Sequence, residues 1–300
     1  AGDDLTDDRD RRLLTELVYG TLRMQGTLDW LIRQFYQGDI RTLEPMVRNI
    51  LRTALYQRFF TERIPDFAIV HEAVELAKKT ANPRRAPLVN AVLRNILRLH
   101  DALPRPAGRE NNPDRLAILH SHPPWLVRKW FRLLGSEETA ALCQANNQIP
   151  PLSVRVNRLR EGRQAVMRKF AEEGIPASEA AFSPDGLIIS RTGQPLRESA
   201  CYRMGLIQVQ DEASQMISRL VAPLAGERVL DLCAGVGGKA THLAEIMRNQ
   251  GEILAVDVQE EKLSALRDLA VRLGTTIVAT RMADAGEDLG GEFHQSFDRV

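Results

Sequence analysis

A glycine-rich turn between two apolar segments holds the residues best suited to chemistry. An apolar run ends at Asp231, and the turn Cys233-Ala234-Gly235-Val236-Gly237-Gly238-Lys239 follows, with a helical pattern behind it. A second apolar segment, 252–256, ends at Asp257, which lies 19 residues after the last glycine (257 − 238). Glycine lets the backbone approach a ligand closely, and a helix N-terminus offers free N–H groups. The pattern predicts a nucleoside site in a Rossmann-like sheet.

Acidic residues discriminate between the possible nucleoside cofactors. The run 235–240 keeps two glycines of the G-x-G-x-x-G/A spacing and ends in alanine, which leaves NAD possible. Asp231, however, would repel a pyrophosphate, whereas its carboxylate can hold the amino group of S-adenosylmethionine. Asp257 can accept both ribose hydroxyls. Asp284 follows a third apolar segment, 276–280, and can accept from the adenine amino group. Three acids at successive strand ends favour S-adenosylmethionine.

These motifs resemble the RsmB (Sun/Fmu) family of bacterial 16S ribosomal RNA cytosine C5-methyltransferases over nearly the whole chain. Residues 209–215 (VQDEASQ) are similar to the family's V-Q-D-x-A-S-Q, and 230–239 (LDLCAGVGGK) to its L-D-L-C-A-A-P-G-G-K. Residues 297–300 (FDRV) resemble the start of its fourth strand. The resemblance implies the cofactor-binding residues Cys233, Ala234, Gly235, Val236, Gly237, Gly238, Lys239, Asp257 and Asp284.

Two positions in the turn depart from the family pattern. Gly235 stands where the family has alanine, and Val236 stands where it has proline. Both changes loosen the turn, since proline fixes φ. We expect them to affect the cofactor affinity more than the identity of the cofactor.

The resemblance also implies catalytic residues that these 300 residues lack. In the family a Cys thiolate adds to C6 of cytosine and makes C5 nucleophilic. A second cysteine serves in product release and an Asp contacts the cytosine, all downstream of F-D-R-V. We therefore expect the catalytic residues beyond Val300, a sequence truncated at both ends, and no turnover by this chain alone. Cys233 is expected to pack in the cofactor turn, and Cys143 and Cys201 fit no nucleophile arrangement.

Composition sets the bounds of the interpretation. With 300 residues of which 44% are hydrophobic, the chain can bury a sizeable core in two or three domains. Three cysteines without paired spacing indicate a reduced cytoplasm and no zinc site. The sequence has no run of about 20 apolar residues, so we expect no membrane span. Basic residues exceed acidic ones over 23–100 (13 − 7) and 128–170 (9 − 3), but not over 200–300 (10 − 15). The basic excess favours RNA contacts outside the cofactor domain.

The hydrophobic periodicity predicts a multidomain chain. Five amphipathic stripes predict an all-α bundle over 1–112, which resembles the antitermination factor NusB at 17–23 (LVYGTLR) and 89–94 (VNAVLR). A linker helix and a small α+β RNA-contacting module are expected over 113–205. The first half of a Rossmann-like, S-adenosylmethionine-binding domain is expected over 206–300. In the bundle, Arg48, Arg52, Arg94 and Arg98 could hold RNA phosphates or only keep the surface soluble.

The small module supplies the RNA-binding candidates. Residues 152–157 alternate apolar and polar side chains, as a half-exposed strand does. We predict that Arg155, Asn157 and Arg158 contact RNA from the solvent face, although such a strand looks much the same without RNA. Upstream, Trp125 and Trp130 are expected in a core.

Three functions remain open from the sequence. The leading interpretation is a monomeric, cytoplasmic enzyme that methylates C5 of a cytosine in 16S ribosomal RNA. The second is a non-catalytic RNA-binding protein with a vestigial cofactor site. The third is an NAD-dependent oxidoreductase.

Overall fold

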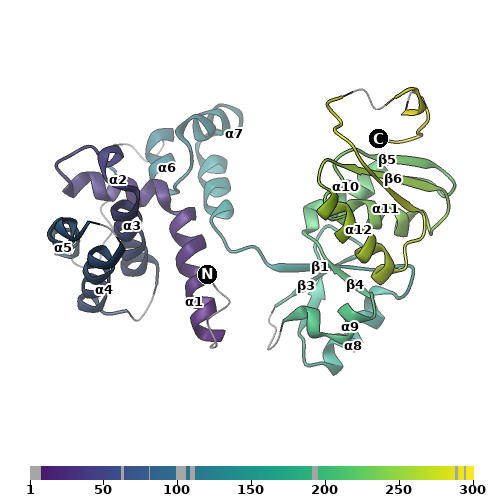
Figure 1. Cartoon of the computed structure of the whole chain (residues 1–300), viewed down its shortest axis with the longest axis horizontal. Helices are drawn as coiled ribbons and strands as arrows, with labels where there is room; N and C mark the ends of the chain where they lie inside the picture. Colours follow the sequence, from purple (N-terminus) through teal and green to yellow (C-terminus); the bar gives the residue numbers. More distant parts are fainter. Residues whose placement is uncertain are drawn as a thin grey trace. The chain divides into compact units, whose positions relative to one another are not determined.

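The chain folds into two compact units, Ala1–Ile149 and Pro150–Val300. The computed structural model describes residues 8–61, 64–80, 82–98, 106–108, 112–190, 195–287, 290–293 and 295–300, and Figure 1 shows their arrangement within each unit. Within these ranges, no helix is both long enough and apolar enough to cross a membrane.

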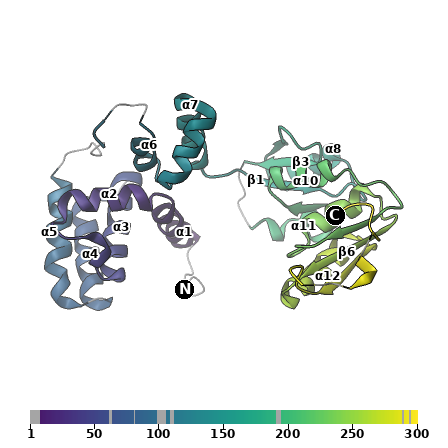
Figure 2. The same cartoon turned by 90° about the horizontal axis from the view of Figure 1, so that it is seen from above.

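Within the described residues, the regular elements of the first unit are all helices, as the apolar stripes predicted (Figure 2). Its core is made by residues such as Leu28, Leu51, Leu55 and Leu93, which are fully buried. The stripe expected in the first helix behaves differently, because Leu13, Leu14, Val18 and Leu22 are exposed. The helices are α1 (Asp8–Arg23), α2 (Gln25–Phe35), α3 (Pro45–Phe60), α4 (Asp66–Thr80), α5 (Ala86–Leu97), α6 (Pro113–Leu119) and α7 (Pro124–Asn146), with 3-10 turns η1 (Ile40–Thr42) and η2 (Pro83–Arg85).

Helices α6 and α7 belong to this first unit. The Thr27 hydroxyl in α2 donates to the Ile118 carbonyl in α6 at 2.6 Å, and the Gly26 N–H donates to the Ser121 hydroxyl at 2.7 Å. Residues 113–146, which the sequence prediction grouped with the strand module, therefore lie with the helical bundle. The prediction that Trp125 is a core residue is wrong, because 66% of its surface is exposed. Trp130 does pack against the small core of α6 and α7.

The second unit begins with an antiparallel sheet of order β2-β3-β1-β4. β1 is a central strand, paired with β3 on one side and β4 on the other, and Phe170 of α8 is buried in the core of this module. The elements are β1 (Leu152–Val156), α8 (Arg163–Glu172), β2 (Ala177–Glu179), β3 (Gly186–Ile189), η3 (Leu196–Glu198), α9 (Ala200–Arg203) and β4 (Ile207–Val209).

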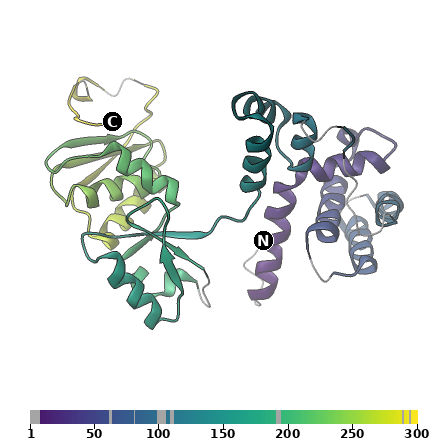
Figure 3. The same cartoon turned by 180° about the vertical axis from the view of Figure 1, so that it is seen from behind.

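A parallel sheet of order β5-β6-β7 completes the second unit, which Figure 3 shows from behind. Its first strand also bridges to Arg299 in parallel, and the Leu230 N–H donates to the Arg299 carbonyl at 2.9 Å. The FDRV segment thus lies beside β5, opposite β6. The elements are α10 (Glu212–Val221), β5 (Arg228–Asp231), α11 (Gly238–Ile246), β6 (Glu252–Asp257), α12 (Glu260–Leu273), β7 (Val278–Met282) and η4 (Gly291–Phe293).

Candidate cofactor site

The three predicted acids lie at one edge of the parallel sheet. Asp231 is the last residue of β5 and pairs in register with Ala255, and Asp257 is the last residue of β6 and pairs with Met282. Asp284 follows two residues after the end of β7. Because neighbouring parallel strands end at the same edge, the structure brings the acids to the side where α/β sheets bind their ligands.

The turn between β5 and α11 depends on two glycines with left-handed backbones. Gly235 has φ of +55° and Gly237 has φ of +85°, a region that side chains with a Cβ rarely adopt. A Cβ at Gly237 would lie 2.4 Å from Leu266 Cγ, whereas a Cβ at Gly235 would meet nothing within 4 Å. Val236 between them is 55% exposed. The turn is therefore closed against α12 at Gly237 and open at Gly235.

Asp257 fixes this turn from the end of the second strand. Its Oδ2 accepts from the Gly235 N–H at 2.9 Å and its Oδ1 from the Gln259 N–H at 3.0 Å. The Gln259 hydrogen bond is the main reason that the pKa of Asp257 lies below its ordinary value, and the Gly235 bond adds to it. Each carboxylate oxygen has a second acceptor site, so the side chain can still accept ribose hydroxyls.

Asp231 has an acceptor that the protein leaves unused. Its Oδ2 is buried without a hydrogen-bond partner, while its Oδ1 accepts from the Cys233 N–H at 3.3 Å. Burial raises the pKa of this carboxyl. A cationic amino group placed against Oδ2 would satisfy the acceptor and favour the charged carboxylate. The orphaned oxygen thus fits the amino group of S-adenosylmethionine.

The remaining predicted cofactor residues surround this turn. Lys239 and Cys233 are exposed, Ala234 is buried, and Gly238 is the first residue of α11. The expectation that Cys233 packs in the turn is wrong, because its side chain is exposed. Asp284 is also exposed, and it accepts from the Gly286 N–H at 2.8 Å.

The other two cysteines have no access to a substrate. Cys143 and Cys201 are both buried. Burial raises the pKa of Cys201 to about 11, so its thiol stays protonated at neutral pH. This agrees with the expectation that neither is a nucleophile.

Two of the three RNA-binding candidates are placed differently from the prediction. Arg155 and Asn157 are both 0% exposed, so the predicted solvent face of β1 is wrong. The Arg155 side chain reaches α11 of the parallel-sheet domain, where it pairs with Glu245 at 2.7 Å. Buried in this way, neither side chain can contact RNA. Arg158 is exposed and stays a candidate.

Sequence reasoning missed the structural role of the VQDEASQ segment. Asp211 caps α10 by accepting from the Ala213 N–H at 2.9 Å. Gln210 accepts from Arg155, and the buried Gln215 amide donates to the Gln210 carbonyl at 3.0 Å. Polar residues at fixed spacing just before an amphipathic helix were the available signal, since an aspartate there is typical of a helix cap.

A parallel sheet with a glycine turn and an acid at each strand end defines an α/β domain that binds a nucleoside cofactor. Three family models match the chain in order. They are the NusB family at residues 2–98, the ferredoxin-like domain of RsmF/B-like methyltransferases at 122–195, and the 16S rRNA methyltransferase RsmB/F at 218–300.

Curated relatives match most of the chain. The chain is 35% identical over 294 residues to the probable ribosomal RNA small subunit methyltransferase B of Bacillus subtilis, covering 98% of this chain and 64% of the relative. It is 34% identical to the Escherichia coli protein of that name, with 98% and 66% covered, and 37% identical to the Pseudomonas putida protein, with 90% and 60% covered. The chain thus spans slightly less than two thirds of the length of these relatives.

Solved structures agree with this relationship. The crystal structure of PH0851 superposes with a TM-score of 0.74 at 28% identity, covering 94% of this chain and 62% of that one. A methyltransferase homologue from Pyrococcus horikoshii gives a TM-score of 0.53 at 27% identity, with 56% and 55% covered. The chain is thus similar to RsmB/F methyltransferases over its C-terminal part and to the NusB family over its N-terminal part. The predicted cofactor, S-adenosylmethionine, agrees with these matches.

Proposed function

We propose that the protein methylates C5 of a cytosine in 16S ribosomal RNA, with S-adenosylmethionine as the methyl donor, and that it acts as a monomer in the cytoplasm. The single observation that carries the proposal is the cofactor turn with its three acids at one sheet edge, and above all the unpartnered Asp231 Oδ2. The match of residues 218–300 to the 16S rRNA methyltransferase RsmB/F model supports the ribosomal RNA substrate.

We assign the cofactor contacts by the chemistry of each group. Asp231 would hold the amino group, Asp257 the ribose hydroxyls and Asp284 the adenine amino group. The turn from Cys233 to Lys239 would supply backbone contacts, since glycine at 235 leaves open space where a Cβ would otherwise point. The bound cofactor supplies an electrophilic methyl group on its sulfonium.

The cysteine nucleophile expected from the family resemblance is none of the three cysteines present. Two are buried, and Cys233 lies in the cofactor turn itself. In the reaction that we propose, a thiolate from outside these 300 residues would add to C6 of cytosine, and C5 would take the methyl group as its bond to the sulfonium breaks. Loss of the C5 proton to a base would then expel the thiolate from C6 and restore the aromatic ring. The expectation that these residues alone do not turn over stays a prediction.

A pocket at the far end of α11 supports a revised set of RNA contacts. This arginine pocket has a volume of about 450 Å³ and is lined by Arg158, Arg219 and Arg248, together with Leu159, Asp185, His242, Glu245 and Ile246. Asp185 is already paired with Arg219 and His242, and Glu245 with Arg155. Among the described residues, the guanidinium groups of Arg158 and Arg248 form no ion pair, so they can neutralise a phosphate of the RNA backbone.

The test is methyl transfer by the natural full-length protein. It is incubated with methyl-labelled S-adenosylmethionine and protein-free 16S ribosomal RNA, and the RNA is digested to nucleosides. Label in 5-methylcytidine supports the proposal. Label in another nucleoside contradicts the C5 assignment, and binding of RNA without any transfer favours the non-catalytic alternative.

A further inference from the structure

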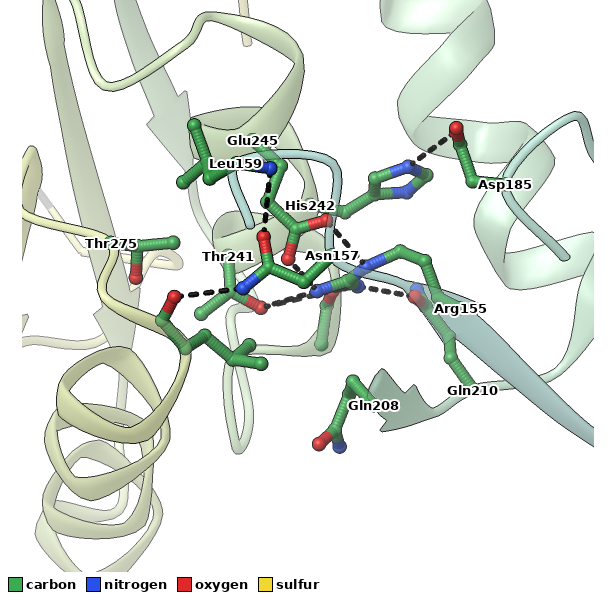
Figure 4. A network of polar contacts seen from close by, with 12 residues as sticks. Arg155, Asn157, Leu159, Asp185, Gln208, Gln210, Thr241, His242, Glu245 and Thr275 are labelled. Carbon is green, nitrogen blue, oxygen red and sulfur yellow. Dashed lines mark hydrogen bonds and ion pairs between the residues drawn. The ribbon is translucent and has the colours of Figure 1, made fainter. Parts of the chain in front are cut away.

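A buried arginine connects the ferredoxin-like module to the cofactor turn. Arg155 lies on the central strand of the module, and its guanidinium points across to α11 of the methyltransferase domain (Figure 4). It forms a two-point ion pair with Glu245, with Nη2 2.7 Å from Oε1 and Nε 3.2 Å from Oε2. Its Nη1 also donates to Gln210 Oε1 at 2.5 Å. All three nitrogens of the guanidinium therefore donate hydrogen bonds.

The same guanidinium reaches the first turn of α11. Its Nη1 donates to the Gly238 carbonyl at 2.7 Å, and its Nη2 donates to the Thr241 hydroxyl at 3.2 Å. That hydroxyl in turn donates to the Gly237 carbonyl at 2.7 Å. Arg155 therefore holds, directly or through Thr241, the two glycines at which the cofactor turn becomes a helix.

A second link between module and domain lies elsewhere and serves as a comparison. The Asn157 amide donates to the Leu273 carbonyl at 2.8 Å and to the Gly205 carbonyl at 2.9 Å. Leu273 is the last residue of α12, whereas the cofactor turn precedes α11. Asn157 is as deeply buried as Arg155 and joins the same two parts, but it has no bond to the turn.

We propose that Arg155 is a positioning residue for the cofactor turn, so that the ferredoxin-like module is part of the cofactor site. The fork geometry of a guanidinium matters here, because it lets one side chain bond a carboxylate, an amide oxygen, a carbonyl and a hydroxyl together. The module thus fixes the direction of the Gly237 and Gly238 peptides, and with them the N–H groups at the start of α11. The expected effect of Arg155 on cofactor affinity rests on the proposed function, in which the protein binds S-adenosylmethionine.

The decisive variants alter one link at a time in the full-length protein. Arg155→Lys keeps a cation beside Glu245 but loses the fork that reaches the turn. Glu245→Gln weakens the buried ion pair and leaves the Gly238 and Thr241 bonds possible. Asn157→Ala breaks the other link. Affinity for S-adenosylmethionine is measured by calorimetry at a temperature where each variant is folded.

Arg155→Lys is expected to weaken cofactor binding by at least about tenfold, equivalent to about 1.4 kcal/mol. Asn157→Ala and Glu245→Gln are expected to lower the melting temperature with an affinity within about twofold of wild type, because neither removes a bond to the turn. Equal losses of affinity in Arg155→Lys and Asn157→Ala would overturn the proposal and reduce Arg155 to a structural link. Should Arg155→Lys fail to fold, Thr241→Val removes the Thr241 bridge and is expected to weaken binding in the same direction.

Hydrogen exchange of the ligand-free protein separates this inference from the proposed cofactor. Arg155→Lys should speed exchange of the amides over 237–241, and Asn157→Ala should not. Unchanged exchange over that segment in Arg155→Lys would overturn the proposal whatever the ligand. If exchange over 237–241 is faster in Arg155→Lys but the wild-type protein does not bind S-adenosylmethionine, the proposed function is overturned and the positioning role of Arg155 stands.

Discussion

Replacing Gly237 by alanine should destabilise the second unit far more than the same change at Gly235. Both residues have positive φ, and an alanine in that region costs roughly 1–2 kcal/mol. At Gly237 the new Cβ would also lie 2.4 Å from Leu266 Cγ, and overpacking of a core adds roughly 1–3 kcal/mol. We therefore expect a loss of roughly 2–5 kcal/mol for Gly237→Ala and roughly 1–2 kcal/mol for Gly235→Ala.

The assay must report on the second unit alone. All three tryptophans, Trp30, Trp125 and Trp130, lie in the first unit, so their fluorescence does not follow the unfolding of the cofactor domain. Hydrogen exchange of peptides covering β5 and β6, followed by mass spectrometry, gives the free energy of opening there. Gly226→Ala is a matched control, since Gly226 has φ of +93° and open space around a Cβ, outside the cofactor turn. Equal losses at 237 and 235 would refute the packing of the turn against Leu266.

Three further predictions follow from the same contacts. Burial lowers the pKa of His242 to about 4 from its ordinary 6.5. As the pH falls, the unfolded chain therefore takes up the imidazole proton before the folded chain does. The stability that neutral His242 contributes is complete above pH 6.5 and falls by up to about 3 kcal/mol as the pH drops toward 4. The free energy of unfolding is measured in urea at several pH values, with hydrogen exchange over β3 as the readout. Plotted against pH, it should vary less in His242→Gln than in the wild type, and two parallel curves would contradict this. Asp211→Ala should cost about 1 kcal/mol through the lost cap of α10, which thermal unfolding can measure against Asp268→Ala on the exposed face of α12. Arg158→Ala should weaken RNA binding and reduce the slope of affinity against salt by about one, whereas an unchanged slope in filter binding would remove the arginine pocket from the RNA path.

The cofactor turn could be predicted because its signals are local. A strand, three glycines and an acid at a set distance specify their own backbone, and the structure places Asp231, Asp257 and Asp284 at one sheet edge as expected. The same holds for the first five helices, whose apolar stripes have helical spacing. Backbone conformation follows from such patterns because it depends on neighbours in sequence.

Burial of polar residues could not be predicted in the same way. The alternation over 152–157 correctly indicated a strand, but it does not say what covers the polar face. Arg155 and Asn157 face partners 90 and 116 residues later in the chain, Glu245 and Leu273. The contact of 113–119 with the bundle could not be predicted for the same reason, because Thr27 and Ile118 meet only in the folded chain.

The most direct test of the central claim is calorimetry of cofactor binding to the wild-type protein, Asp257→Ala and the surface control Asp268→Ala. We predict that S-adenosylmethionine binds the wild type while NAD does not. Asp257→Ala should lose roughly 1.5–3 kcal/mol of binding free energy for each hydrogen bond to the ribose, whereas the affinity of Asp268→Ala should be that of the wild type. Binding of NAD, or an affinity for S-adenosylmethionine that survives the loss of Asp257, would contradict the account.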